Sequence, residues 1–209
     1  MREVRWAAVG SGLAVLLTLC AACGPDGPTL AQGMQAASRA RTPVAREYWN
    51  VFNSILGVIR PFSGAEADGS FHTCSPPSGQ PAGKADQVSY EIANTVEARD
   101  KKLQSSPGRF ESVIEQTLNS RGWGSFVTLS AVGPGSQGGE YRRGRNGPYS
   151  VYIEQHTGTL ANLLELTVRG PCVTTGTALV SMGPPEPSDH YPDNQAAARP
   201  MPTEPLPTP

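Results

Sequence analysis

The chain has 209 residues, a formal net charge of −1 at pH 7 and only 17% charged residues, with 23 glycines and 20 prolines. This length allows one domain with a hydrophobic core, with or without tails. The near-zero net charge gives no electrostatic reason to expect nucleic acid or an anionic membrane surface as a partner. So much glycine and proline is typical of a loop-rich extracytoplasmic protein rather than of a compact cytosolic enzyme.

The N-terminus has the pattern of an export signal. Arg2 and Arg5 give it a positive start, and residues 6–22 carry no charge. The continuous apolar run, residues 13–17, is short beside the roughly 20 apolar residues of a membrane-spanning helix. Small residues and then Cys23 follow the apolar stretch, as at a cleavage site.

Residues 20–23, Cys-Ala-Ala-Cys, resemble the lipobox of bacterial lipoprotein precursors. In that motif the last cysteine receives a diacylglyceryl group and becomes the first residue after cleavage. The resemblance implies a signal peptide over residues 1–22 and a lipid-carrying Cys23 on the outer face of the cytoplasmic membrane. One position departs from the motif, because Cys20 stands where leucine is usual. Ordinary cleavage after Ala22 and an uncleaved anchor are the two alternatives.

The segment after the signal, residues 23–41, is small and polar, and we expect it to form a tether. A helix is predicted next, because Thr42 is a good N-cap and Pro43 suits the first helical position. Pro61 ends this helix. The domain is therefore expected over residues 42–183. The apolar residues of the helix fall on one face, at Val44, Tyr48, Val51, Phe52, Ile55 and Ile59.

A second helix is predicted to start at Ser106-Pro107 and to stop at Gly122. Alternating apolar residues over 88–97 favour a half-buried strand, although one side of a helix would also fit them. Three more strands are indicated by β-branched and aromatic residues between glycine turns, over 126–132, 149–155 and 160–168.

This order of elements predicts an α+β fold. A short segment around Cys74 can add an edge strand, so the order is α-β-β-α-β-β-β. Two helices packed on one face of a mainly antiparallel sheet is the natural arrangement for such a chain. In the last segment, residues 184–209, nine of 26 residues are proline, and we expect a disordered tail.

Cys74 and Cys172 remain after processing, and in an oxidising compartment two such cysteines are expected to form a disulfide. His72 lies two residues before Cys74, which raises the alternative of a metal site. Metal sites need three or four protein ligands, however, and there is no second His/Cys pair. We therefore predict one disulfide, no metal and no cofactor.

No catalytic residue is predicted. The chain contains none of the sequence motifs of serine hydrolases, zinc proteases, P-loop enzymes or dinucleotide-binding enzymes. His72 and His156 are the remaining candidates for general acid–base catalysis, and nothing adjacent in the sequence supports either one. A hydrolase acting on envelope material therefore stays only as an alternative.

Arg142, Arg143 and Arg145 form the densest charge cluster, between glycines that indicate a loop between strands. Three guanidinium groups could bind the phosphates or carboxylates of a cell-wall polymer. A solubilising hairpin loop is the competing interpretation. Trp123, between two glycines, is interpreted as a residue at the edge of the core rather than as a sugar-stacking platform.

The domain resembles LppA-type lipoproteins of mycobacteria and related actinobacteria in sparse landmarks along most of the chain. The matching pieces are AREYWNVFNSILGVI, Cys74, FESVIEQTLNSRGWG, the strands up to LLELTVRGPC, and MGPPEP. The resemblance implies no activity. Together these observations predict a lipid-anchored envelope protein with a binding or structural role. Its partners would be the membrane, through the lipid, and a wall polymer or another envelope protein, but not nucleic acid.

Overall fold

The computed structural model describes residues 27–63, 66–74, 86–130, 140–156, 160, 162–183, 189–191 and 206. The predicted signal peptide and Cys23 lie outside these residues. None of the described helices combines the length and the apolarity that crossing a bilayer requires. In chain order the elements are α1 (Leu30–Ile55), β1 (Ile59–Pro61), β2 (Ala67–Thr73), β3 (Gln87–Ala98), α2 (Lys101–Gln104), α3 (Pro107–Asn119), β4 (Gly124–Ser130), β5 (Glu140–Asn146), β6 (Tyr149–Gln155), β7 (Leu163–Arg169), β8 (Val173–Thr174), α4 (Thr177–Ser181) and β9 (His190–Tyr191).

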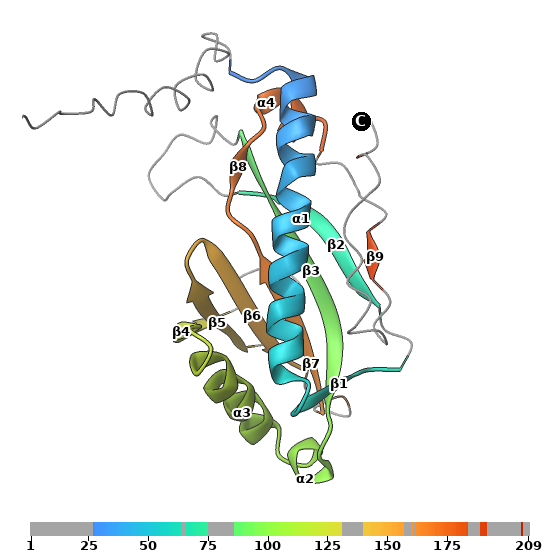
Figure 1. Cartoon of the computed structure of the whole chain (residues 1–209), viewed down its shortest axis with the longest axis vertical. Coiled ribbons are helices and arrows are strands. Elements are labelled where there is room, and N and C mark those ends of the chain that lie inside the picture. Colours follow the sequence, from blue (N-terminus) through green and yellow to red (C-terminus); the bar gives the residue numbers. More distant parts are fainter. Residues whose placement is uncertain are drawn as a thin grey trace, which may run out of the picture.

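The described strands form one antiparallel sheet. Its order is β4-β5-β6-β7-β3-β2-β9, and β1 and β8 also pair with β3. The two longer helices, α1 and α3, lie on the same face of this sheet, with α1 crossing β3 and β7 and with α3 beside β4 and β6 (Figure 1). The predicted α+β class is confirmed. The helix predicted from Ser106-Pro107 to Gly122 is present as α3, and the strands predicted over 88–97 and 149–155 are present as β3 and β6.

The hydrophobic core lies between α1 and the sheet. Alternate residues of β3 point at the helix, and Tyr90, Ile92 and Val96 among them are fully buried. Tyr48, Trp49 and Phe52 of α1 form an aromatic cluster whose ring centroids are 5.2 to 5.8 Å apart. Burial of such large side chains is the main stabilising contribution of this layer.

The helix start predicted at Thr42 is wrong, because α1 begins at Leu30. Thr29 caps it: its hydroxyl accepts a hydrogen bond from the Gln32 amide at 3.3 Å, and the Thr29 amide donates to the Gln32 side chain at 2.9 Å. Pro43 lies inside the helix. Close packing holds the early turns, since a Cβ on Gly33 would stand 2.0 Å from the Thr175 carbonyl oxygen. Residues 30–41 are therefore part of the domain rather than a tether.

Part of the predicted disordered tail is docked on the domain, so that prediction is wrong for these residues. The carboxylate of Asp189 is buried and accepts hydrogen bonds from two guanidinium nitrogens of Arg41, with Nε at 2.6 Å, and from the Tyr90 hydroxyl at 2.6 Å. The Gly69 amide donates to the Asp189 carbonyl at 3.0 Å, and β9 pairs with β2. Leu206 joins the buried core. Arg41 is 148 residues away from Asp189 in sequence. The proline-rich segment therefore contains no local pattern from which its docking could be predicted.

The predicted disulfide is confirmed. Cys74 and Cys172 are bonded, with their Cα atoms 6.2 Å apart and a sequence separation of 98. Cys74 follows β2 and Cys172 follows β7, the two strands that flank β3. In the chain-entropy view, closing a loop of this length stabilises the fold by about 4 to 5 kcal/mol. The bridge therefore holds together the neighbouring strand ends around β3.

We expect Asp189→Asn to lower the free energy of unfolding by about 3–5 kcal/mol, because it removes the carboxylate charge of Asp189 from its ion pair with the buried Arg41 guanidinium. Truncation after Gly183 should have at least as large an effect. Urea denaturation of the lipid-free mature protein measures both. Glu66→Gln is the matched control, since Glu66 is exposed and its change should stay within about 0.5 kcal/mol. An unchanged urea midpoint in the truncated protein would mean that the docked segment contributes nothing to the free energy of unfolding.

Candidate functional site

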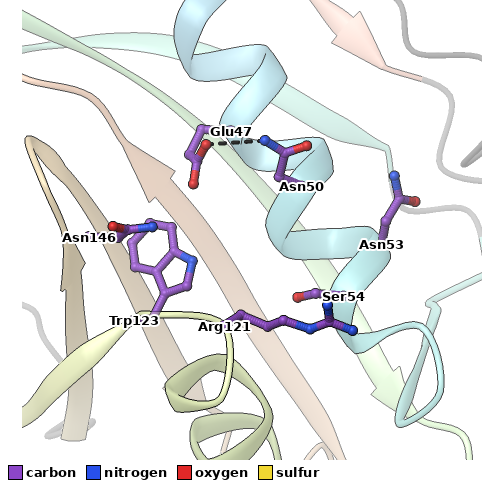
Figure 2. Close-up of a pocket in the computed structure, with 7 residues that line it drawn as sticks. All are labelled: Glu47, Asn50, Asn53, Ser54, Arg121, Trp123 and Asn146. Atoms are coloured by element: carbon purple, nitrogen blue, oxygen red, sulfur yellow. Dashed lines mark hydrogen bonds between the residues drawn. The ribbon is translucent and has the colours of Figure 1, made fainter.

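A polar groove of about 540 Å³ lies where the end of α1 meets the α3–β4 connection and the β5–β6 turn. Figure 2 draws the lining side chains, which come from these three parts of the chain. Six of the seven lining residues are polar or charged. The groove is lined by Glu47, Asn50, Asn53, Ser54, Arg121, Trp123 and Asn146.

The local sequence explains why these side chains meet. Glu47, Asn50 and Ser54 follow one line of α1 at spacings of three and four residues, beside the buried face of the helix. Gly122 (φ +91°) and Gly147 (φ +56°) adopt left-handed conformations that other residues rarely take. These glycines turn the chain after α3 and between β5 and β6, so the residues next to them reach the groove.

The groove offers both hydrogen-bond donors and acceptors, and its formal charges balance. The Asn50 side chain donates to the Glu47 carboxylate at 3.2 Å, as Figure 2 marks. The Ser54 hydroxyl donates to the Val51 carbonyl at 2.6 Å, which leaves its oxygen free to accept. Arg121 is exposed and extends toward Ser54 (Figure 2). This mixture of donors and acceptors, with one positive and one negative side chain, suits a neutral ligand with many hydroxyl or amide groups better than an ion.

Trp123 lines the groove beside Asn146 (Figure 2), but it is only 3% exposed. Its ring packs in the core, so it presents no face on which a sugar could stack. The interpretation of Trp123 as a residue at the edge of the core is in keeping with this burial. Sequence reasoning missed the groove itself, because amide and acidic residues on an exposed helix flank look like an ordinary solvated surface.

The arginine cluster does not form a loop and does not converge. Residues 142, 143 and 145 belong to β5, which pairs with β6. Arg142 pairs with Ile153, and Ile153 is buried on the face that the helices cover. Arg143 and Arg145 lie on the opposite, open face. The predicted loop carrying three guanidinium groups is therefore wrong. The side chain of Arg142 lies outside the described part of the structure.

The open face of the sheet carries an ion-pair cluster centred on Glu91 of β3. The Glu91 carboxylate contacts the His72 Nε2 at 2.6 Å with one oxygen and the Arg169 guanidinium at 2.5 and 2.6 Å with the other. The Arg169 guanidinium also lies 4.9 Å from the centroid of the Tyr152 ring. The sequence alone makes His72 a candidate for a metal ligand or a general acid–base catalyst and gives no sign of this ion pair.

Ser70, His72 and Glu91 do not form a nucleophilic relay. The Ser70 hydroxyl lies 3.1 Å from His72 Nε2, the same nitrogen that contacts Glu91. A Ser–His–acid relay needs the serine and the acid on opposite ring nitrogens. His156 follows β6, three strands across the sheet from β2, and it is level with Glu97 of β3, whereas His72 pairs with Ser89. At ordinary strand geometry this is about 14 Å across the sheet and about 26 Å along it, so the two histidines are not brought together.

Cys74 is oxidised in the disulfide and offers no thiolate to a metal. Among the residues that the structure describes, there is no group of three or more His, Cys, Asp or Glu side chains that could hold a metal ion. The alternative of a metal site at His72 and Cys74 therefore loses one of its two ligands.

Comparison with known proteins gives one structural neighbour. No family model matches the chain, and no curated protein matches it either. The chain is similar to a crystal structure of LppA from Mycobacterium tuberculosis, a protein described as a lipoprotein. The two share 10% identity at a TM-score of 0.29, and the match covers 69% of this chain and 85% of LppA. A likeness this weak carries no argument about fold or function.

The Glu91 cluster should make stability depend on pH. Burial raises the pKa of Glu91, but the hydrogen bond to His72 and the charge of Arg169 outweigh it and lower the pKa below 4.5. Because the folded-state pKa is lower than the unfolded one, the carboxylate stabilises the fold above pH 4.5, and this contribution is lost as the pH falls through the folded-state pKa.

Glu91→Gln should therefore lower the free energy of unfolding by about 1–3 kcal/mol at neutral pH. The difference from the unsubstituted protein should shrink as the pH falls below 4.5. Urea denaturation at several pH values measures it. A difference that stays constant down to acid pH would show that Glu91 acts through packing and not through its charge.

Proposed function

We propose that the protein is a bacterial lipoprotein, anchored through Cys23 on the outer face of the cytoplasmic membrane, that binds a hydroxyl-rich envelope ligand in the polar groove. The lipobox-like residues 20–23 support the anchor and a signal peptide over residues 1–22. The Cys74–Cys172 disulfide suits an oxidising, extracytoplasmic compartment. The landmarks shared with LppA-type lipoproteins favour an actinobacterial envelope.

The position of the groove along α1 suits this role. Only residues 24–28 separate Cys23 from the capping Thr29, so this cap lies within about 22 Å of the anchored residue. Glu47 and Ser54 come 17 and 24 residues after Leu30, which is about 25 and 36 Å along the helix axis. The anchor and the groove are therefore at opposite ends of α1, and a ligand in the cell wall can reach the groove.

The groove's composition indicates a neutral glycan. Asn50, Asn53 and Asn146 each supply an amide that both donates and accepts, as a sugar hydroxyl requires. A peptide would need apolar pockets for its side chains, and the one aromatic residue in the groove, Trp123, is 3% exposed. The volume of about 540 Å³ lies within the range of about 300–1,000 Å³ common for small-ligand sites. This amide-lined groove is the observation that carries the proposal.

The alternative of a hydrolase has less support. Glycoside hydrolysis ordinarily uses two carboxylates on either side of the scissile bond. Among the described residues that line the groove, Glu47 is the one carboxylate, and it already accepts a hydrogen bond from Asn50. We therefore propose binding without turnover.

The anchor can be tested by substitution in cells. Cys23→Ser should abolish labelling with radioactive palmitate and either release the protein from membranes or leave an unprocessed precursor. A single lipid signal of several chains suffices to hold the protein, since each buried methylene contributes about 0.8 kcal/mol. Cys20→Leu is the control: it restores the usual first residue of the lipobox and should keep the label. Palmitate incorporation that survives Cys23→Ser would overturn the assignment.

Ligand binding can be tested with the lipid-free mature protein and soluble neutral oligosaccharides, by titration calorimetry. We expect the double substitution Asn50→Ala with Asn146→Ala to weaken binding about thirtyfold, since each of the two lost hydrogen bonds contributes about 1 kcal/mol. Gln116→Ala, an exposed amide on α3 outside the groove, should change nothing. Binding that is insensitive to the groove substitutions, or binding of peptides but of no glycan, would contradict the proposal.

A further inference from the structure

The open face of the sheet brings Arg169 next to Arg143 and Arg145, which are far from it in the sequence. Arg145 of β5, Ser150 of β6 and Arg169 of β7 form one row across the sheet. Arg143 pairs with Tyr152 in the next row on the same face. At ordinary strand geometry Arg145 and Arg169 are about 10 Å apart, and Arg143 is about 7 Å from Arg145.

Arg169 is held in a fixed orientation. Its Nε and one terminal nitrogen contact a single oxygen of Glu91, and its guanidinium lies over the ring of Tyr152. A guanidinium has five N–H donors, so this arrangement leaves donors of Arg169 for a ligand. Its side chain is 36% exposed. A donor that is already positioned loses little conformational entropy on binding.

Arg143 and Arg145 have no carboxylate within ion-pair distance among the described residues. Arg145 is exposed, and Arg143 is partly buried, with no hydrogen-bond partner for its Nε in the part of the chain that the structure describes. A buried guanidinium N–H without an acceptor costs free energy, which an anion laid beside it could recover. The two guanidinium groups therefore present positive charge that the described fold does not neutralise.

Acidic residues mark one boundary of this surface. Glu154 and Glu165 face each other across β6 and β7, two residues beyond Tyr152 and on the same face. Burial and the charge of Glu154 raise the pKa of Glu165. An anion would thus avoid this end and lie over Arg143, Arg145 and Arg169.

We propose that these three arginines form a second binding site, which takes a polymer carrying repeated phosphate groups. A guanidinium group can donate two parallel hydrogen bonds to two oxygens of one phosphate group. Because the three arginines are about 7–10 Å apart, they suit several phosphate groups along a polymer better than one free phosphate. The site is on the sheet face opposite α1 and α3, whereas the glycan groove lies beside α1. The two sites are therefore independent of each other.

The test uses the lipid-free mature protein and short-chain inorganic polyphosphate, with polyglutamate as a carboxylate polymer, by fluorescence anisotropy at several salt concentrations. The double substitution Arg143→Gln with Arg145→Gln should weaken polyphosphate binding about tenfold at low salt and flatten its salt dependence. Arg109→Gln removes the same charge from the exposed side of α3 and should have little effect. Asn50→Ala, in the groove, should leave polyphosphate binding unchanged.

Arg145→Gln alone keeps the experiment decisive if the double variant fails to fold, because Arg145 is exposed. It should keep the melting temperature and weaken polyphosphate binding about threefold. Unchanged binding in this folded variant, or an equal loss with Arg109→Gln, would overturn the site. Equal affinity for polyglutamate would overturn the assignment to phosphate.

Discussion

The buried ion pair between Arg41 and Asp189 is the interaction on which the arrangement of this domain depends. It joins α1 to a segment near the C-terminus, and Tyr90 of β3 donates a hydrogen bond to the same carboxylate. A buried guanidinium is costly to desolvate and stays inside only with its counter-charge in place. Gly69 makes room for this cluster, since a Cβ there would stand 1.8 Å from the Tyr90 hydroxyl oxygen. The pair therefore fixes the first half of α1 over the sheet.

The two faces of the sheet then acquire different roles. β3 is central, with β2 and β7 beside it and β1 and β8 at its ends, and the disulfide joins the segments that follow β2 and β7. One face is closed by α1 and α3 (Figure 1) and forms the core. The other face keeps charged side chains in ordered pairs around Glu91. Because α1 is one continuous helix, its fixed first half also sets where its last turns, and hence the groove, stand.

Much of this fold could be predicted because its signals are local. Periodic apolar residues identified the second helix and the main strands, and the number of cysteines remaining in an oxidising compartment predicted the bridge. The start of α1 was missed, since Thr42-Pro43 imitates a helix start while the real cap is Thr29 with Gln32. Pro43 is accommodated inside a helix that packing holds on both sides of it.

The other errors have long-range causes. Asp189 sits in a proline-rich segment, and its buried partners lie far away in the sequence. The segment around Arg143 has the glycines of a loop, yet it is a strand. In that strand a Cβ on Gly144 would stand 2.6 Å from the ring of Phe126, so a larger residue there would displace this ring. The groove could not be predicted from the sequence, because its residues come from three separate segments and only the fold makes them neighbours.

The most direct test of the account is to map the ligand site by NMR. Titration of the isotope-labelled, lipid-free protein with a neutral oligosaccharide should shift the side-chain amide signals of Asn50, Asn53 and Asn146, which line the groove. The side-chain amide of Gln116, outside it, should stay in place. Shifts confined to the open face around Arg145 and Arg169, or no shifts at saturating sugar, would contradict the claim that the groove is the functional site.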